Sequence, residues 1–173
     1  AVHEGGSSIA VLRGVDVKSG GRVLQISSMI RNGKLDDLVD EEGGSTGIVI
    51  GSGLASKIGA AAGESVTLLV PGASEDGLPV SGVYRVISLF ESGMYDYDSS
   101  LVFLSLGEAQ RLLGAFGRVN GLEVRASNPD ESGMVTARIR SRLGYPYLAR
   151  DWKEMHRNLF QMLSMQKAVI AVI

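Results

Sequence analysis

Short runs of Val, Ile and Leu separated by glycine-rich turns recur through the first 126 residues and indicate β-strands. Residues 23–30 fit a helix or a strand equally well, and the Ser-Gly-Gly sequence at 19–21 predicts a turn. The middle of the chain is therefore expected to be rich in strands. In chain order, the predicted strands cover residues 9–17, 47–50, 64–70, 83–90, 101–104 and 119–126.

Three segments carry the start signal of a helix, which is a capping residue followed three positions later by Glu. These segments are 105–108, 128–131 and 151–154. They predict helices over 109–113, from 128 to about 143, and from 151 onward. Shorter helical patterns occur at 34–42 and 54–58. The last helix would carry an apolar stripe made of Met155, Leu159, Phe160, Met162 and Leu163.

The order of these elements predicts an α+β fold in four parts. An N-terminal strand and linker region (1–45) precedes a β-rich subdomain (46–117), a β-α-β segment (118–150) and a final helix (151–173). The second strand of the β-α-β segment is expected at 145–149. Because one such segment cannot cover its own sheet, further strands are expected from residues 1–45 or from additional chain.

The composition is that of an ordinary globular protein, with 45% apolar residues, 21% charged residues and a formal net charge of −2. The lack of a basic excess argues against a nucleic-acid partner. The 23 glycines exceed the usual share and indicate many tight turns. With no Cys and two distant histidines, His3 and His156, the chain offers no disulfide, thiolate nucleophile or evident metal site.

One stretch has the form of a nucleotide-binding turn, in which strand 47–50 leads through Gly51-Ser52-Gly53 into a helix. The G-x-G-x-x-G pattern needs a third Gly at position 56, where Ser56 stands. A plain strand-to-helix turn is therefore favoured, and no cofactor is predicted.

Clusters of acidic residues occur at 36–37, at 40–42 and at Asp96 and Asp98. They lie in polar segments and lack the ligand spacing of a calcium loop. No Ser–His–Asp arrangement can be placed either. Catalytic and metal-binding residues are therefore not predicted.

Residues 91–100 form a predicted loop in which Met94, Tyr95 and Tyr97 lie close together. Loops that carry Met and aromatic residues often form partner surfaces. The alternative is that Met94 and Tyr95 fold back over the core.

The sequence closes on six apolar residues, 168–173. Six residues are too few to cross a bilayer, which needs about 20. The run is either part of a helix that docks into the core or the start of a transmembrane helix.

Several motifs resemble the lipoprotein-releasing permeases, the LolC/LolE family, which falls within the MacB-like exporter class. The most specific is E-S-G-M-Y-D-Y-D-S-S at 91–100, which is followed by A-Q-R-L-L at 109–113. The resemblance runs through nearly the whole chain. The other matching motifs are L-R-G-V-D at 12–16, G-I-V-I-G-S-G-L-A at 47–55, and D-W at 151–152 with N-L-F at 158–160.

The resemblance implies a permease of the inner membrane with four transmembrane helices and a periplasmic domain between the first two. Its expected partners are a cytoplasmic ATPase subunit, a second permease protomer and a lipoprotein client, and it implies no catalytic site on this chain. The periplasmic domain would combine a β-rich subdomain with a porter-like one made of two β-α-β halves. Residues 118–150 match the second half, and 168–173 would begin the second transmembrane helix.

In that family a protruding hook docks a soluble periplasmic lipoprotein carrier. The corresponding connection here, 71–82, is shorter than the hook and lacks a T-P-M-G-like tip and a basic residue. Glu75 and Asp76 could meet a basic partner, and an ordinary exposed loop is the alternative. The candidate partner-binding residues are Glu75, Asp76, Leu78, Pro79, Met94, Tyr95 and Tyr97.

Two other functions stay open at this stage. One is a MacB-type permease that exports a peptide or drug. The other is a soluble enzyme that binds a small molecule at the 51–53 turn.

Overall fold

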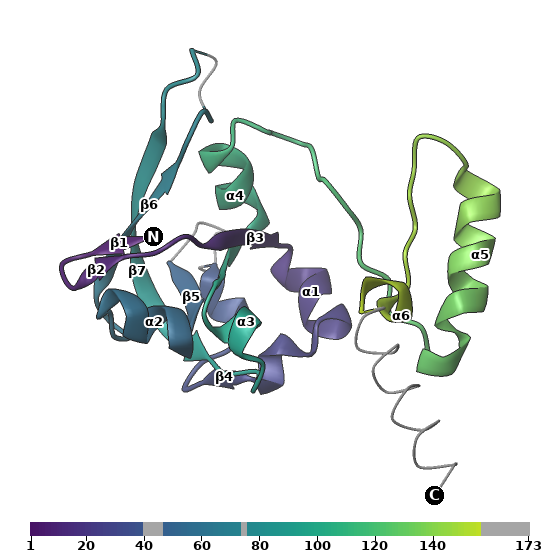
Figure 1. Cartoon of the computed structure of the whole chain (residues 1–173), viewed down its shortest axis with the longest axis horizontal. Coiled ribbons are helices and arrows are strands. Elements are labelled where there is room, and N and C mark those ends of the chain that lie inside the picture. Colours follow the sequence, from purple (N-terminus) through teal and green to yellow (C-terminus); the bar gives the residue numbers. More distant parts are fainter. Residues whose placement is uncertain (40–46, 74–75, 157–173) are drawn as a thin grey trace, which may run out of the picture. The chain divides into compact units, whose positions relative to one another are not determined.

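In the computed structural model, which describes residues 1–39, 47–73 and 76–156, the chain forms two units, Ala1–Glu123 and Val124–Ile173. The described part of the first unit is built on one curled eight-stranded sheet in the order β2-β1-β6-β7-β5-β8-β3, with β4 also paired to β7 (Figure 1). The strands are β1 (Val2–His3), β2 (Gly6–Ser7), β3 (Val11–Val15), β4 (Ile30–Arg31), β5 (Ile48–Gly51), β6 (Ser65–Val70), β7 (Val80–Phe90) and β8 (Leu101–Ser105).

The two central strands, β5 and β8, are apolar at almost every position because both faces of the sheet are covered. Successive side chains on a strand point to opposite faces. Ile50 and Val102 accordingly lie in one core cluster, whereas Val49 and Phe103 lie in another. In the second cluster the rings of Phe103 and Phe90 meet edge to face at 5.2 Å between centroids.

Short helices cover both faces of this sheet. The helices α2 (Ser52–Ile58) and α4 (Leu106–Leu112) contribute to the first core cluster. The 3₁₀ segments η1 (Gln25–Ser28) and η2 (Leu35–Leu38) contribute to the second, next to helix α1 (Val17–Val23). This two-faced packing around a mixed sheet confirms the predicted α+β fold class.

The predicted turn at 19–21 is wrong, since these residues lie inside α1. Asp16 caps the helix by accepting hydrogen bonds from the Lys18 N–H at 3.2 Å and the Ser19 hydroxyl at 2.7 Å. A Cβ on Gly20 would lie 2.4 Å from a methyl carbon of Val15. The glycine therefore lets the helix pack closely against the sheet, and it does not mark a turn.

Residues 1–39, expected as a strand and linker region, supply β1, β2, β3 and β4 to the same sheet. These strands pair with strands that are distant in sequence; β3, for example, pairs in parallel with β8. This part of the chain is thus built into the first unit.

The strands β6 and β7 form an antiparallel hairpin that protrudes from the sheet (Figure 1). Strand β7 begins at Val80, three residues before the predicted start at 83, because Val70 pairs with Val80. The connection therefore covers 71–79. Within the hairpin, Leu69 and Val83 are exposed.

The second unit contains a 3₁₀ turn η3 (Pro129–Glu131), helix α5 (Ser132–Leu143) and helix α6 (Trp152–Met155). Asn128 caps the first of these and Asp151 caps the last, as predicted from their spacing. Arg140 ties the unit together, because its guanidinium donates to the Ala149 carbonyl and forms an ion pair with Glu154 at 2.6 Å.

The strands predicted at 119–126 and 145–149 are not formed. A strand needs a neighbouring strand for its backbone hydrogen bonds, and the described part of the chain offers these segments none. Their apolar side chains, such as Leu122, Val124, Tyr145 and Leu148, are exposed. The assignment of 118–150 to half of a porter-like subdomain stays a prediction.

Among the described residues, no helix has the length and apolarity needed to span a membrane. The apolar run at 168–173 and most of the predicted stripe lie outside the described residues. The one stripe residue within them, Met155, is exposed.

Candidate partner-binding surfaces

The sequence-predicted site residues fall into two groups at opposite ends of β7. One group belongs to the hairpin connection before Val80, and the other follows Phe90. Eleven residues of extended strand separate the groups by roughly 35 Å. They therefore form two candidate surfaces, which we call the hairpin tip (76–79) and the post-β7 loop (91–98).

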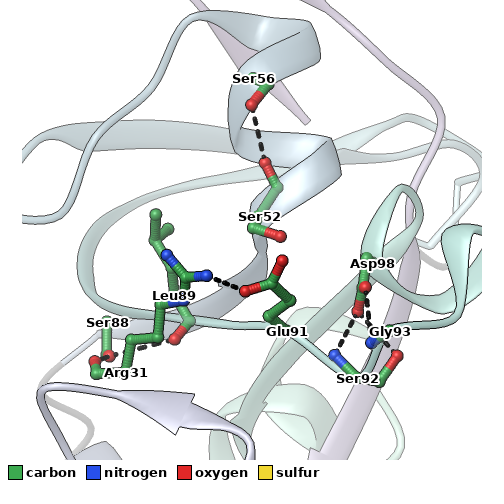
Figure 2. A network of polar contacts seen from close by, with 9 residues as sticks. All are labelled: Arg31, Ser52, Ser56, Ser88, Leu89, Glu91, Ser92, Gly93 and Asp98. Carbon is green, nitrogen blue, oxygen red and sulfur yellow. Dashed lines mark hydrogen bonds and ion pairs between the residues drawn. The ribbon is translucent and has the colours of Figure 1, made fainter.

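The post-β7 loop is folded around the carboxylate of Asp98, which is 8% exposed. One carboxylate oxygen accepts hydrogen bonds from the backbone N–H and the hydroxyl of Ser92, both at 2.7 Å. The other accepts from the Gly93 N–H at 3.1 Å (Figure 2). Part of this segment, predicted as a plain loop, forms a one-turn helix α3 (Tyr95–Asp98).

The glycines of the 51–53 turn have a packing role beside this loop. A Cβ on Gly51 would lie 2.1 Å from the carbonyl oxygen of Asp98, and one on Gly53 would lie 3.1 Å from it. Absence of both side chains lets the start of α2 and the end of α3 pack backbone against backbone. This contact explains the Gly-x-Gly sequence without a nucleotide.

Three further contacts hold the end of β7 and the start of the loop to β4 and to Met29, which precedes it. Glu91 forms an ion pair with Arg31, and its N–H donates to the Met29 carbonyl at 2.9 Å. The Ser88 hydroxyl donates to the carbonyl of Arg31 (Figure 2). Sequence reasoning missed Arg31 and Ser88, because the pairing of β4 with β7 joins segments about 60 residues apart.

The loop presents apolar side chains outward. Tyr95 is 72% exposed and Met94 is 50% exposed, so neither folds back over the core. The ammonium of Lys57 lies 5.3 Å from the centre of the Tyr95 ring, which restricts the ring. Tyr97, by contrast, is half-buried against the second core cluster.

At the hairpin tip, Asp76, Leu78 and Pro79 are exposed, with 63% exposure for Leu78. Glu75 lies outside the described residues. The tip therefore offers one carboxylate beside an apolar pair, on a connection that the hairpin carries away from the sheet (Figure 1).

A polar triad, in which Tyr84 is buried, Glu108 is partly buried and Arg111 is exposed, ties the hairpin base to α4. The Tyr84 hydroxyl donates to Glu108 at 2.7 Å, and the Arg111 guanidinium pairs with the same carboxylate. Burial, helped by this hydrogen bond to Glu108, raises the pKa of Tyr84 to about 12. Hydrogen bonding from Arg111 lowers the pKa of Glu108, while the carboxylate raises that of Arg111.

The sequence placed Glu108 in a reciprocal helix cap with Ser105, and half of that prediction is confirmed. Ser105 accepts from the Glu108 N–H at 3.3 Å. The Glu108 side chain points instead to Tyr84 and Arg111. No group of three or more His, Asp or Glu side chains suited to a metal ion occurs within the described residues.

Comparison with known proteins gives several relatives, and three of them carry the same name. The chain is 26% identical over 169 residues to the lipoprotein-releasing system transmembrane protein LolC of Neisseria meningitidis serogroup B, and this match covers 94% of the chain. Proteins of the same name from two strains of Xylella fastidiosa are 27% identical, with 95% of the chain covered. The chain spans about two fifths of the length of these relatives, since the matches cover 39% and 40% of them.

A family model described as the MacB-like periplasmic core domain matches residues 2–142. This range includes the whole first unit except its first residue, both candidate surfaces, and nearly all of α5. Because the match covers most of the sequence, the chain belongs to the family of MacB-like periplasmic core domains.

Proposed function

We propose that this chain is the periplasmic part of an ABC-exporter permease that releases lipoproteins from the inner membrane. The observation that carries the proposal is similarity to lipoprotein-releasing LolC proteins along 94–95% of the chain, within the MacB-like periplasmic family. The full-length protein would lie in the inner membrane with this part in the periplasm. A separate cytoplasmic ATPase and a second permease protomer would complete the transporter.

The proposed work is mechanical. A sheet that is packed on both faces resists deformation, so it would move as a rigid body. A displacement that starts at the membrane would therefore also displace the hairpin tip. The Tyr84–Glu108–Arg111 triad supports this, because it ties the hairpin base to α4. A transport subunit of this kind needs no catalytic residue on the periplasmic side.

The two candidate surfaces would contact different partners, since they lie at opposite ends of β7. The hairpin tip, with Asp76, Leu78 and Pro79, is the proposed contact for a soluble lipoprotein carrier. The post-β7 loop, with Met94 and Tyr95, is the proposed contact for the second permease protomer or the client. Exposed apolar side chains support both assignments. The hydrogen bonds to Asp98 also restrain the backbone of the post-β7 loop.

The direct test is release of a lipoprotein from proteoliposomes that contain the full-length protein, the second permease protomer and the ATPase subunit. We expect ATP-dependent release into a solution containing the soluble carrier, and none with an ATPase variant that cannot hydrolyse ATP. L78S should reduce transfer to the carrier, whereas L113S, at an exposed leucine that directly follows α4, should not. Absence of ATP-dependent lipoprotein release would contradict the proposal.

The family description is also compatible with a second candidate function, that of a MacB-type permease that exports a peptide or drug. The same proteoliposomes distinguish the two functions. Transport of an unacylated peptide or a drug, without release of a lipid-anchored protein, would support the second candidate.

A further inference from the structure

The two units of the chain carry opposite net charges. Residues 1–123 contain nine Lys and Arg against fifteen Asp and Glu, which gives −6. Residues 124–173 contain eight Lys and Arg against four Asp and Glu, which gives +4. The two values add up to the formal net charge of −2, so the charge of the whole chain does not show the difference. A positively charged unit beside a negatively charged one indicates that the second unit faces an anionic partner.

Two of the eight cations of the second unit lie together on one face of α5. Thr136 and Arg140 mark the inner face of the helix, because Thr136 is buried and Arg140 binds the Ala149 carbonyl and Glu154. Arg138 is two residues from both Thr136 and Arg140. At about 100° per residue it therefore points to nearly the opposite side of the helix, about 200° from each of them. Arg138 and Arg142 therefore share the outer face with Met134, in a row of residues spaced four apart. We call this row the basic face of α5.

The side chains of the basic face are available to a partner. Arg138, Arg142 and Met134 are all exposed. Within the part of the chain that the structure describes, neither Arg138 nor Arg142 forms an ion pair. Arg142 lies in the last turn, where the helix dipole favours a cation, but Arg138 lies a full turn earlier. Two like charges four residues apart slightly destabilise a helix, so local stability does not account for the pair.

The place of the second unit in the chain identifies the partner. Residues 168–173 are all apolar, and eleven residues, 157–167, separate them from His156. Even when fully extended, this connection spans at most roughly 40 Å. If 168–173 enter a bilayer, as the proposed function expects, the basic face stays close to the membrane surface. Cations beside exposed apolar side chains are typical of surfaces that bind anionic headgroups.

We infer that the basic face of α5, formed by Arg138 and Arg142 with Met134, binds the anionic headgroups of the membrane into which the chain leads. The inference rests on the proposed function only in placing 168–173 at the bilayer. Binding would orient the second unit on the membrane surface, so that movement of the membrane helices is transmitted through a supported unit.

The test is binding of chain 1–173 to vesicles of phosphatidylcholine alone and of phosphatidylcholine mixed with phosphatidylglycerol, measured by co-sedimentation. We expect tighter binding to the mixed vesicles at low salt, and loss of that difference at high salt. R138Q/R142Q should weaken binding to mixed vesicles roughly 25-fold, since each cation near an anionic surface contributes about a fivefold factor. R138K/R142K keeps both charges and should bind like the unaltered chain.

The matched control is K18Q/R85Q, which removes two exposed cations from the first unit and should leave vesicle binding unchanged. Unaltered circular dichroism in each variant would exclude unfolding as the cause of a loss. Equal binding by R138Q/R142Q and the unaltered chain would overturn the inference. So would a loss of binding in R138K/R142K.

Two other outcomes would also overturn it while leaving the proposed function in place. Equal, salt-independent binding to both kinds of vesicle would assign membrane attachment to the apolar residues 168–173 alone. Salt-dependent self-association that R138Q/R142Q abolishes, without vesicle binding, would assign the basic face to the acidic unit of a second copy. Failure of the proposed function itself would appear instead in the lipoprotein-release assay.

Discussion

At the scale of single residues, glycines and one aspartate determine the shape of the post-β7 loop. Gly51 permits a backbone contact that any side chain would block, and Asp98 collects three hydrogen bonds from Ser92 and Gly93. The loop can therefore expose Met94 and Tyr95 while its backbone stays restrained. A restrained loop loses less conformational entropy when it meets a partner.

The contact at Gly51 predicts that G51A is strongly destabilising, by about 3 kcal/mol. The added Cβ would lie 2.1 Å from a backbone oxygen, which cannot rotate away as a flexible side chain could. Urea unfolding measures the loss. The control is G107A in α4, where a Cβ meets nothing within 4 Å, and it should stabilise the chain by about 0.5–1 kcal/mol. Equal effects of the two variants would contradict this account.

For Asp98, D98N should cost about 2 kcal/mol, because the amide replaces a charged acceptor of three hydrogen bonds with a neutral group. Hydrogen exchange should show faster exchange of the Ser92 and Gly93 amides than in the unaltered chain. D96N, which changes an exposed side chain in the same loop, should have little effect. Unchanged protection of both amides in D98N would refute this role of the carboxylate.

At the scale of elements, the triad of Tyr84, Glu108 and Arg111 connects the longest strand to α4. The side chain of Glu108 is only 13% exposed, so its ionised form depends on the two partners. Since β7 also begins in the hairpin, the triad limits how the hairpin base can move against the helix.

The lowered pKa of Glu108 predicts a pH-dependent contribution to stability. A carboxylate whose pKa is depressed by folding stabilises the fold above its ordinary value of 4.5, and that contribution is lost as the pH falls through the folded pKa. E108Q should therefore be less stable than the unaltered chain at neutral pH, by about 1 kcal/mol. The difference in unfolding free energy between E108Q and the unaltered chain should disappear at acid pH.

Urea midpoints measured across this pH range check the prediction for Glu108. E4Q, at an exposed carboxylate, should follow the unaltered chain at every pH. A gap between E108Q and the unaltered chain that stays constant with pH would show that the ionised form of Glu108 is not what stabilises the triad.

At the scale of the whole molecule, the two units differ in how well each buries its apolar residues. The first unit has two core clusters around its sheet. In the described part of the second unit, Thr136 is the one residue that reaches full burial. The first unit is therefore expected to fold by itself, whereas the second depends on neighbours to cover Val124, Tyr145 and Leu148.

This difference predicts that a fragment of residues 1–123 unfolds in one cooperative transition, with nearly the stability that the first unit has in the whole chain. Limited proteolysis of the whole chain should cut first between 117 and 127, where the backbone is exposed and lacks regular structure. A fragment 1–123 that fails to unfold cooperatively, or first cuts within β5 or β8, would contradict the division into units.

Features that depend on neighbours in sequence could be predicted from the sequence. Asn128 and Asp151 cap helices where their spacing places them, and Gly59 ends α2 with a left-handed backbone, φ 71°. The short apolar runs of β5 and β8 predicted strands for the same local reason, since each run is recognised from its own residues.

Features that depend on residues distant in sequence were decided by the tertiary structure. The glycine at position 20 serves the close packing of α1 against Val15, and the Glu108 side chain binds Tyr84 and Arg111 in place of the helix cap. Residues 119–126 have the pattern of a strand, but the described part of the chain places no strand beside them. The pattern of residues determines which side chains a strand would present. The backbone hydrogen bonds of that strand, however, need a second segment beside it, and only the folded chain determines whether one is there.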